Sequence, residues 1–120
     1  MNREPAIRVV LLPRDTNANG TIFGGIILSH IDLAGAVEAK RHTKEKIVTV
    51  AMKEVVFKQP VMVGEVVSFY TTVTRIGRTS ISVNVQVESF RDGKVVPVTH
   101  ADLTYVAIDE NGNPTPVAGK

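Results

Sequence analysis

The sequence has 120 residues, of which 43% are hydrophobic and 22% charged, with no cysteine and a net charge of +2. This length and balance are typical of one globular domain, and the missing cysteines exclude disulfides, thiolate metal sites and a cysteine nucleophile. There is no run of roughly five like charges, which argues against nucleic-acid binding. There is no apolar run of roughly 18 residues, which argues against a membrane span. Together with the absence of cysteine, this favours the cytoplasm as the location.

The first half of the chain predicts a short strand and one long helix. Residues 7–12 are rich in aliphatic side chains and end at Pro13, as a strand does. Gly24 to about Lys40 is the only convincing helix, and its side chains are apolar almost all round. Such a helix must be covered on most of its sides.

The second half predicts four more strands and an irregular tail. β-branched residues mark the strands, and residues 79–90 alternate cleanly, with Ile81, Val83, Val85 and Val87 on one face. The predicted strands span residues 46–57, 65–76, 79–90 and 95–108, and the tail begins at about Asp109.

Short connections favour antiparallel neighbours, so these elements predict an α+β fold in which an antiparallel five-stranded sheet wraps around one long central helix. Residues 1–120 then form a single domain. One helix cannot cover the whole inner face of the sheet and stay shielded on its own outer side. We therefore expect the remaining apolar surface to be buried in a dimer.

Asp32 lies two turns into the predicted helix, on a face built largely of small residues. Its neighbours at three and four residues are Leu28, Ser29, Gly35 and Ala36. A ligand or another backbone can therefore approach the carboxylate closely. Because an apolar setting is costly for a carboxylate that is neither paired nor used, Asp32 is a candidate catalytic residue. The alternative is a structural carboxylate at a helix edge.

The glycine pair Gly24-Gly25 begins the helix after a polar turn that contains Asn17 and Asn19. The N–H groups at a helix start can stabilise a thioester or ester oxygen, although a glycine pair also suits an ordinary turn. The helix separates Gly24 from Asp32 by roughly 12 Å, too far for both to contact one reacting carbonyl. A site that uses both must be shared by two antiparallel helices of a dimer. Turn geometry explains Asn19 and leaves Asn17 open.

The remaining polar residues give weaker signals. His30 lies on a different helix face from Asp32, so we expect it to pack in the core or an interface rather than bind a metal. Ser29 lacks the Gly-x-Ser-x-Gly turn of a serine hydrolase. His42 and His100 have no partner at the spacing of a triad or a metal site, and no phosphate loop or dinucleotide motif is present. No metal is expected.

The turn formed by Gly77, Arg78, Thr79 and Ser80 carries a cation and two hydroxyls at the tip of a predicted hairpin. Such a tip is usually a solvated turn. It could also bind a phosphate, with Lys53, Lys58 and Arg75 as further candidates.

Several of these segments resemble one known family. The stretch from Pro13 to Gly25, the following Asp32, the Gly64-Glu65-Val66 triplet and the Gly77–Ile81 segment are similar to hotdog-fold acyl-CoA thioesterases, in particular the YciA-type and brain-type acyl-CoA hydrolases. The resemblance covers about residues 11–114. It implies a hotdog fold and dimers that often associate into trimers of dimers, a homohexamer. Some relatives fuse two copies, whereas this chain has one, so a second identical chain must supply the complementary half.

The resemblance also implies roles for individual residues. Asp32 matches the catalytic carboxylate of the helix, and Asn17 matches the catalytic amide, contributed by the opposite subunit. Gly24 and Gly25 match the backbone donors at the helix start. The hairpin residues Gly77, Arg78, Thr79 and Ser80 match a region that helps to hold CoA.

The leading hypothesis is an acyl-CoA thioesterase, and the family resemblance implies broad acyl specificity. Asp32 would act as a general base on water, or as a nucleophile. A thiolate leaves readily, so no general acid is required, and CoA is part of the substrate, so no separate cofactor is expected. One alternative is a hotdog acyl-thioester hydratase, which needs a histidine near the carboxylate. The other is a non-catalytic acyl-CoA-binding oligomer.

Overall fold

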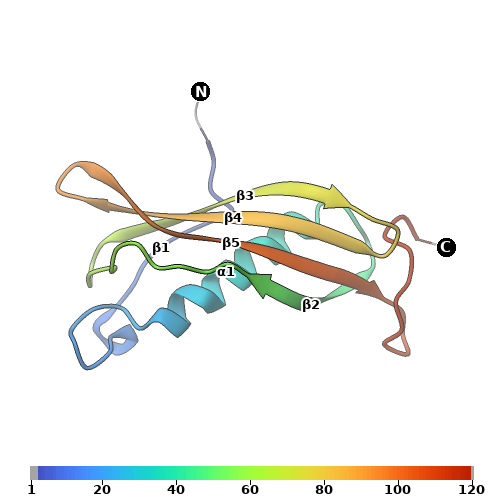
Figure 1. Ribbon diagram of the computed structural model, residues 1–120, viewed down its shortest axis with the longest axis horizontal. Helices are drawn as coiled ribbons and strands as arrows, with labels where there is room; N and C mark the ends of the chain where they lie inside the picture. The colour runs from blue at the N-terminus through green and yellow to red at the C-terminus, as the bar shows by residue number, and fades with distance from the viewer. Residues whose placement is uncertain (1–2, 120) are drawn as a thin grey trace.

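A computed structural model describes residues 3–119, in which a curved sheet lies over one long helix (Figure 1). The helix and strands follow the predicted order and confirm the α+β architecture. A single 3₁₀ turn, Pro13–Asp15, was not predicted. The elements are β1 (Ile7–Val10), α1 (Gly24–Ala39), β2 (Lys46–Lys53), β3 (Val66–Ile76), β4 (Ser80–Arg91) and β5 (Lys94–Ile108).

The sheet is antiparallel throughout, in the order β1-β3-β4-β5-β2. The rule that short connections join neighbours holds for β3, β4 and β5 but is wrong for β2, which pairs with β5 instead of β3. The connection of residues 54–65 is long enough to cross from β2 to β3 past β5 and the start of α1. Its Lys58 N–H donates to the Val98 carbonyl of β5 at 2.8 Å, and its Val61 carbonyl accepts the Ile22 N–H, just before α1, at 2.9 Å.

Strand β2 ends four residues before its predicted end at Phe57. Glu54 has a φ of +59°, in the left-handed region, and this turns the chain out of the ladder. The Thr99 hydroxyl then holds the departing segment by donating to the Val56 carbonyl at 2.7 Å. A register shift between Thr49 and Ala51 places a β-bulge within β2.

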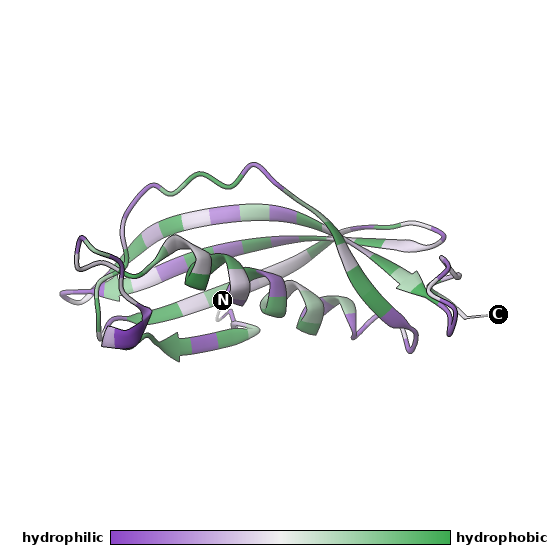
Figure 2. Cartoon of the chain, turned by 90° about the horizontal axis from the view of Figure 1, so that it is seen from below, coloured by the Kyte–Doolittle hydropathy of each residue, from purple (hydrophilic) through white to green (hydrophobic). Residues whose placement is uncertain are grey.

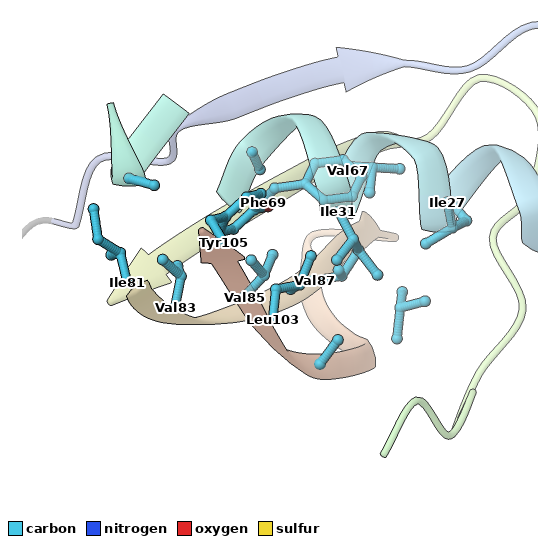
Figure 3. Close-up of a cluster of buried hydrophobic side chains, with 14 of the residues drawn as sticks. Ile27, Ile31, Val67, Phe69, Ile81, Val83, Val85, Val87, Leu103 and Tyr105 are labelled. Carbon is cyan, nitrogen blue, oxygen red and sulfur yellow. The ribbon is translucent and has the colours of Figure 1, made fainter. Parts of the chain in front are cut away.

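The core lies between α1 and the inner face of the sheet (Figure 3). Ile27 and Ile31 project from the helix toward the strands, and both are at most 1% exposed. The inward side chains predicted for residues 79–90 are buried, which confirms that alternation, and Figure 2 shows the alternation of polar and apolar residues along the strands. The His30 ring stacks on Phe69 with the ring centres 5.6 Å apart, which confirms a packing role.

One side of α1 remains apolar and uncovered in the single chain. Leu33 and Val37 are 58% and 43% exposed, and we name these two residues the helix-side patch. On the edge strand β2, Val48 and Val50 are also exposed, at 40% and 56%. Among residues 3–119 no helix is long and apolar enough to cross a membrane.

The tail after β5 has no regular structure in its described part, as predicted, but it is fixed against the sheet. Thr115 and Val117 are 3% and 6% exposed. The Val117 N–H donates to the Arg78 carbonyl at 2.8 Å, and the Thr43 hydroxyl donates to the Val117 carbonyl at 2.7 Å.

Candidate active site

The Asp32 carboxylate is half-buried on α1, beneath the β2–β5 side of the sheet. The Thr49 hydroxyl donates to Asp32 Oδ1 at 2.7 Å. The Tyr105 hydroxyl donates to the backbone carbonyl of Asp32 at 2.7 Å and lies 3.3 Å from Oδ1. No group in residues 3–119 donates to Oδ2, so this oxygen can accept a hydrogen bond from water.

Tyr105 reaches the helix because residue 35 is glycine. A Cβ at Gly35 would lie 2.2 Å from the Tyr105 hydroxyl oxygen, which no side chain could tolerate. The small-residue face predicted around Asp32 is therefore filled at this point by the chain's own tyrosine. Burial, followed by the charge and hydrogen bond of Asp32, raises the pKa of Tyr105 well above its ordinary value, so the phenol keeps its proton and stays a donor.

The start of α1 offers backbone donors, as the glycine pair predicted. Phe23 is the N-cap residue without a side-chain capping bond, and its own N–H donates to the Asp15 carbonyl at 2.8 Å. The N–H groups of Gly24 and Gly25 have no acceptor within the described chain. A Cβ at Gly25 would lie 2.6 Å from Cε2 of Phe23, so the ring lies directly over this glycine. The N–H groups without an acceptor and the helix dipole together favour an anionic oxygen here.

A pocket of about 250 Å³ opens beside Gly24. Its walls are mostly apolar and include Ile27, Phe57, Val61 and Val98. Phe57 forms the outer wall, with its ring 3.7 Å from the position of a Cβ at Gly24. An apolar group attached to a carbonyl at the helix start could enter this pocket.

Asn17 closes the turn that leads to the helix. Its Oδ1 accepts the N–H groups of Asn19 and Thr21 at 2.8 and 3.2 Å, and its Nδ2 donates to the Thr21 hydroxyl at 2.9 Å. Gly20 completes the turn with a φ of +81°. Because a side-chain amide has two N–H donors, one N–H of Asn17 remains for a ligand. Asn17 can therefore donate a hydrogen bond, while its acceptor oxygen is occupied.

The hairpin of Gly77, Arg78, Thr79 and Ser80 joins β3 to β4 at the end of the sheet away from the helix start (Figures 1 and 2). The Gly77 N–H closes it by donating to the Ser80 carbonyl at 2.8 Å. Arg78 is exposed at its tip. A single chain thus separates the hairpin from Gly24 and Gly25.

The further cations are also exposed, and they lie in different places. Lys58 lines the pocket beside Gly24, whereas Arg75 lies near the end of β3 that leads into the hairpin, and Lys53 ends β2. One chain does not gather them into a single cluster.

Sequence reasoning missed three contacts of these polar residues. Thr49 and Tyr105 contact Asp32 from 17 and 73 residues away, and no local spacing signals either contact. His42 has a partner after all, because its Nε2 lies 3.2 Å from Oε2 of Glu38, one helical turn earlier. An i,i+4 search would have found this pair. No group of three potential metal ligands occurs among residues 3–119.

Residues 19–96 match the thioesterase superfamily. The chain belongs to the thioesterase superfamily. It is 40% identical over 113 residues to acyl-CoA thioester hydrolase YciA of Escherichia coli (strain K12), an alignment that covers 90% of this chain and 86% of the relative.

Solved structures of the superfamily show the same fold. Cj0915, a hexameric hotdog fold thioesterase of Campylobacter jejuni, superposes with a TM-score of 0.89 at 45% identity, covering 96% of this chain and 90% of that chain. The hexameric thioesterase y2039 from Yersinia pestis superposes with a TM-score of 0.92 at 38% identity, covering 99% and 98%. The predicted hotdog fold is confirmed.

Proposed function

We propose that this protein is an acyl-CoA thioesterase, which hydrolyses acyl-CoA to a carboxylic acid and CoA with broad acyl specificity. The carrying observation is the Asp32 carboxylate, which is held through Oδ1 and open at Oδ2, on a helix that begins with free N–H groups. The similarity to proteins named acyl-CoA thioester hydrolases supports the same reaction. A structure described as a hexameric broad specificity acyl-coenzyme A thioesterase, at 37% identity, supports the breadth.

Asp32 acts as the general base. Its Oδ2 takes a proton from water as the water oxygen attacks the thioester carbon, a role that contributes about 10²–10⁴ in rate. The N–H groups of Gly24 and Gly25 stabilise the developing oxyanion, at roughly 3–4 kcal/mol for one donor. The carbon–sulfur bond then breaks, and the thiolate of CoA leaves with the electron pair and is protonated from Asp32 or solvent. Asn17 positions the water or the thioester with its remaining N–H.

The site is shared between two subunits. Two helical turns separate Asp32 from Gly24 within one chain. The Gly77–Ser80 hairpin lies at the end of the sheet away from the start of α1 (Figure 1). A partner whose helix runs antiparallel brings its own Gly24 and Asn17 toward Asp32. The exposed helix-side patch and the exposed apolar residues of the edge strand β2 support such a dimer.

The dimers associate as a trimer of dimers. A second apolar surface crosses the outer face of the sheet, where Val10, Val66, Phe90 and Val95 lie opposite one another on four neighbouring strands. They are 37% to 59% exposed. Two separate apolar surfaces suit an assembly with two kinds of contact, and several neighbours are hexameric. In this proposal the hairpin residues Gly77–Ser80 hold CoA. No separate cofactor takes part, because CoA belongs to the substrate. The cytoplasm stays the predicted location.

A thiol-release assay over a panel of acyl-CoAs tests the function. Native protein should release CoA from several of them, and Asp32→Asn should lower kcat at least 100-fold without changing the assembled mass. Asp92→Asn is the matched control, because it makes the same substitution at an exposed turn whose φ of +51° suits asparagine.

Three results would contradict parts of this proposal. Near-native turnover by a folded Asp32→Asn protein would refute the mechanism. Binding of acyl-CoA without thiol release by the native protein would favour the non-catalytic alternative. Loss of an enoyl-CoA double bond without thiol release would favour the hydratase.

A further inference from the structure

We propose that Tyr105 is a positioning residue for catalysis, which fixes the Asp32 carboxylate from the sheet and reaches it only because residue 35 is glycine. This inference rests on the proposed function, in which Asp32 is the base. Tyr105 itself is 1% exposed and lies in the core between the sheet and the helix, so it does not touch the substrate (Figure 3).

The two hydroxyls that contact Asp32 form a cross-strand pair. Thr49 on β2 lies directly opposite Tyr105 on β5 in the sheet register, so both side chains project from one point of the sheet toward the helix. Both lie within 3.3 Å of the same carboxylate oxygen, Oδ1. The other oxygen, Oδ2, has no donor among residues 3–119 and is left for water.

A β-bulge adjoins this pair. The register of β2 and β5 shifts between Thr49 and Ala51, immediately after Thr49. Bulges occur next to active sites, where they redirect a side chain. Here the bulge follows the one residue of β2 that bonds to the carboxylate.

Tyr105 controls both the backbone and the side chain of Asp32. Its hydroxyl donates to the Asp32 carbonyl at 2.7 Å and lies 3.3 Å from Oδ1, so it limits rotation of the carboxylate relative to the helix. A base must be held close to its productive geometry for efficient proton transfer. Because burial keeps the phenol protonated, it remains a donor at every pH at which the enzyme would work.

On the helix, the contact between Tyr105 and Asp32 requires glycine at position 35. Glycine within a helix is destabilising relative to alanine, so its presence in the middle of α1 needs a reason. The reason is the phenol, whose oxygen would lie 2.2 Å and whose Cζ would lie 3.0 Å from a Cβ at this position. Alanine here would push the hydroxyl away from Asp32.

Tyr105→Phe removes the hydroxyl and keeps the ring in the core. We expect kcat to fall about tenfold, the effect of one hydrogen bond to a charged group, with KM for acyl-CoA unchanged within twofold. Tyr70→Phe is the matched control, because it removes the other tyrosine hydroxyl, which accepts only an exposed bond from Arg8. This control should keep native kcat and KM.

Gly35→Ala provides a second, independent variant. It should lower kcat by a similar factor with KM preserved, because the new methyl group displaces the same hydroxyl. Added to Tyr105→Phe, it should lower kcat by less than twofold further, because the closest clash is already gone and the ring carbons at 3.0 and 3.1 Å need to shift by only a few tenths of an ångström. Each variant is checked for native mass and thermal midpoint.

The outcomes separate this inference from the proposed function. If Asp32→Asn is inactive but Tyr105→Phe keeps native kcat, the positioning role is wrong and the proposed function stands. If Tyr105→Phe loses turnover only together with its assembly or with a matching rise in KM, the role is structural and the inference is also wrong. If Asp32→Asn is active, the proposed mechanism itself fails.

Discussion

The ion pair between Glu65 and Arg91 gives the protein a calculable sensitivity to acid. Glu65 accepts hydrogen bonds from Arg91, from the Met62 N–H at 2.9 Å and from the Ser89 hydroxyl at 3.0 Å. Arg91 also donates to the Pro60 carbonyl at 2.7 Å. These bonds tie the 54–65 connection, which walls the pocket beside Gly24, to the β4–β5 hairpin.

The lowered pKa of Glu65 sets the size of the expected change in unfolding free energy. Its hydrogen bond to Arg91, opposed by burial and aided by Met62 and Ser89, lowers the pKa from 4.5 to about 2. At about 1.4 kcal/mol per pH unit, the full shift corresponds to roughly 3 kcal/mol of unfolding free energy. Arg91 is 26% exposed, so solvent screening reduces the expected contribution to about 1–2 kcal/mol.

The sign follows from the lowered pKa. Because the folded state holds the proton more weakly than the unfolded state, the stabilisation is complete above about pH 5 and is lost as the pH falls toward 2. Glu65→Gln should therefore lower the unfolding free energy by about 1–2 kcal/mol at pH 7, and the difference from native protein should shrink between pH 5 and pH 2.

Urea unfolding at fixed protein concentration, repeated over this pH range, measures the difference. Glu110→Gln is the control, because it removes the same charge from an exposed residue in the turn after β5. A Glu65→Gln deficit that is absent at pH 7, or that persists undiminished at pH 2, would show that the ion pair does not stabilise the fold as argued.

Three further predictions concern the shared site. Co-expressed Asn17→Asp and Asp32→Asn chains, each inactive alone, should recover about a quarter of native activity, because half of randomly paired dimers carry one intact site of two; hybrids shown by mass that recover nothing would place the site within one chain. Arg78→Ala should raise KM for acyl-CoA more than it lowers kcat, whereas Lys94→Ala, at the other hairpin tip, should do neither; an unchanged KM for Arg78→Ala would make the hairpin a bystander. Leu33→Lys should dissociate the dimer, seen by light scattering, and abolish turnover, and an active monomer would refute sharing.

Local patterns predicted the parts of the fold that depend on local physics. The two-residue alternation of residues 81–87 identified the inner face of β4, and the apolar run after Gly24 identified α1. The end of β2 could not be placed, because the left-handed backbone at Glu54 has no signature in a residue that usually avoids it. The pairing of β2 with β5 depends on a crossover whose path no local pattern sets.

The residues of the candidate site also fall into those that local patterns predict and those that they do not. The sequence singles out Asp32 and the glycine pair as candidates because their chemistry is unusual for their position on a helix. Thr49 and Tyr105 were missed because a threonine and a tyrosine in predicted strands look like ordinary strand residues. Only the register that sets them opposite each other makes them partners of Asp32.

The contact between Gly35 and Tyr105 restricts the evolutionary drift of this sequence. Any side chain at position 35 would overlap the phenol oxygen, which lies 2.2 Å from the place of its first carbon. A lineage that acquires alanine at 35 must first, or simultaneously, lose the hydroxyl at 105, and a lineage that keeps the tyrosine must keep the glycine. Position 35 can therefore change only after, or together with, position 105, which lies 70 residues away in the chain.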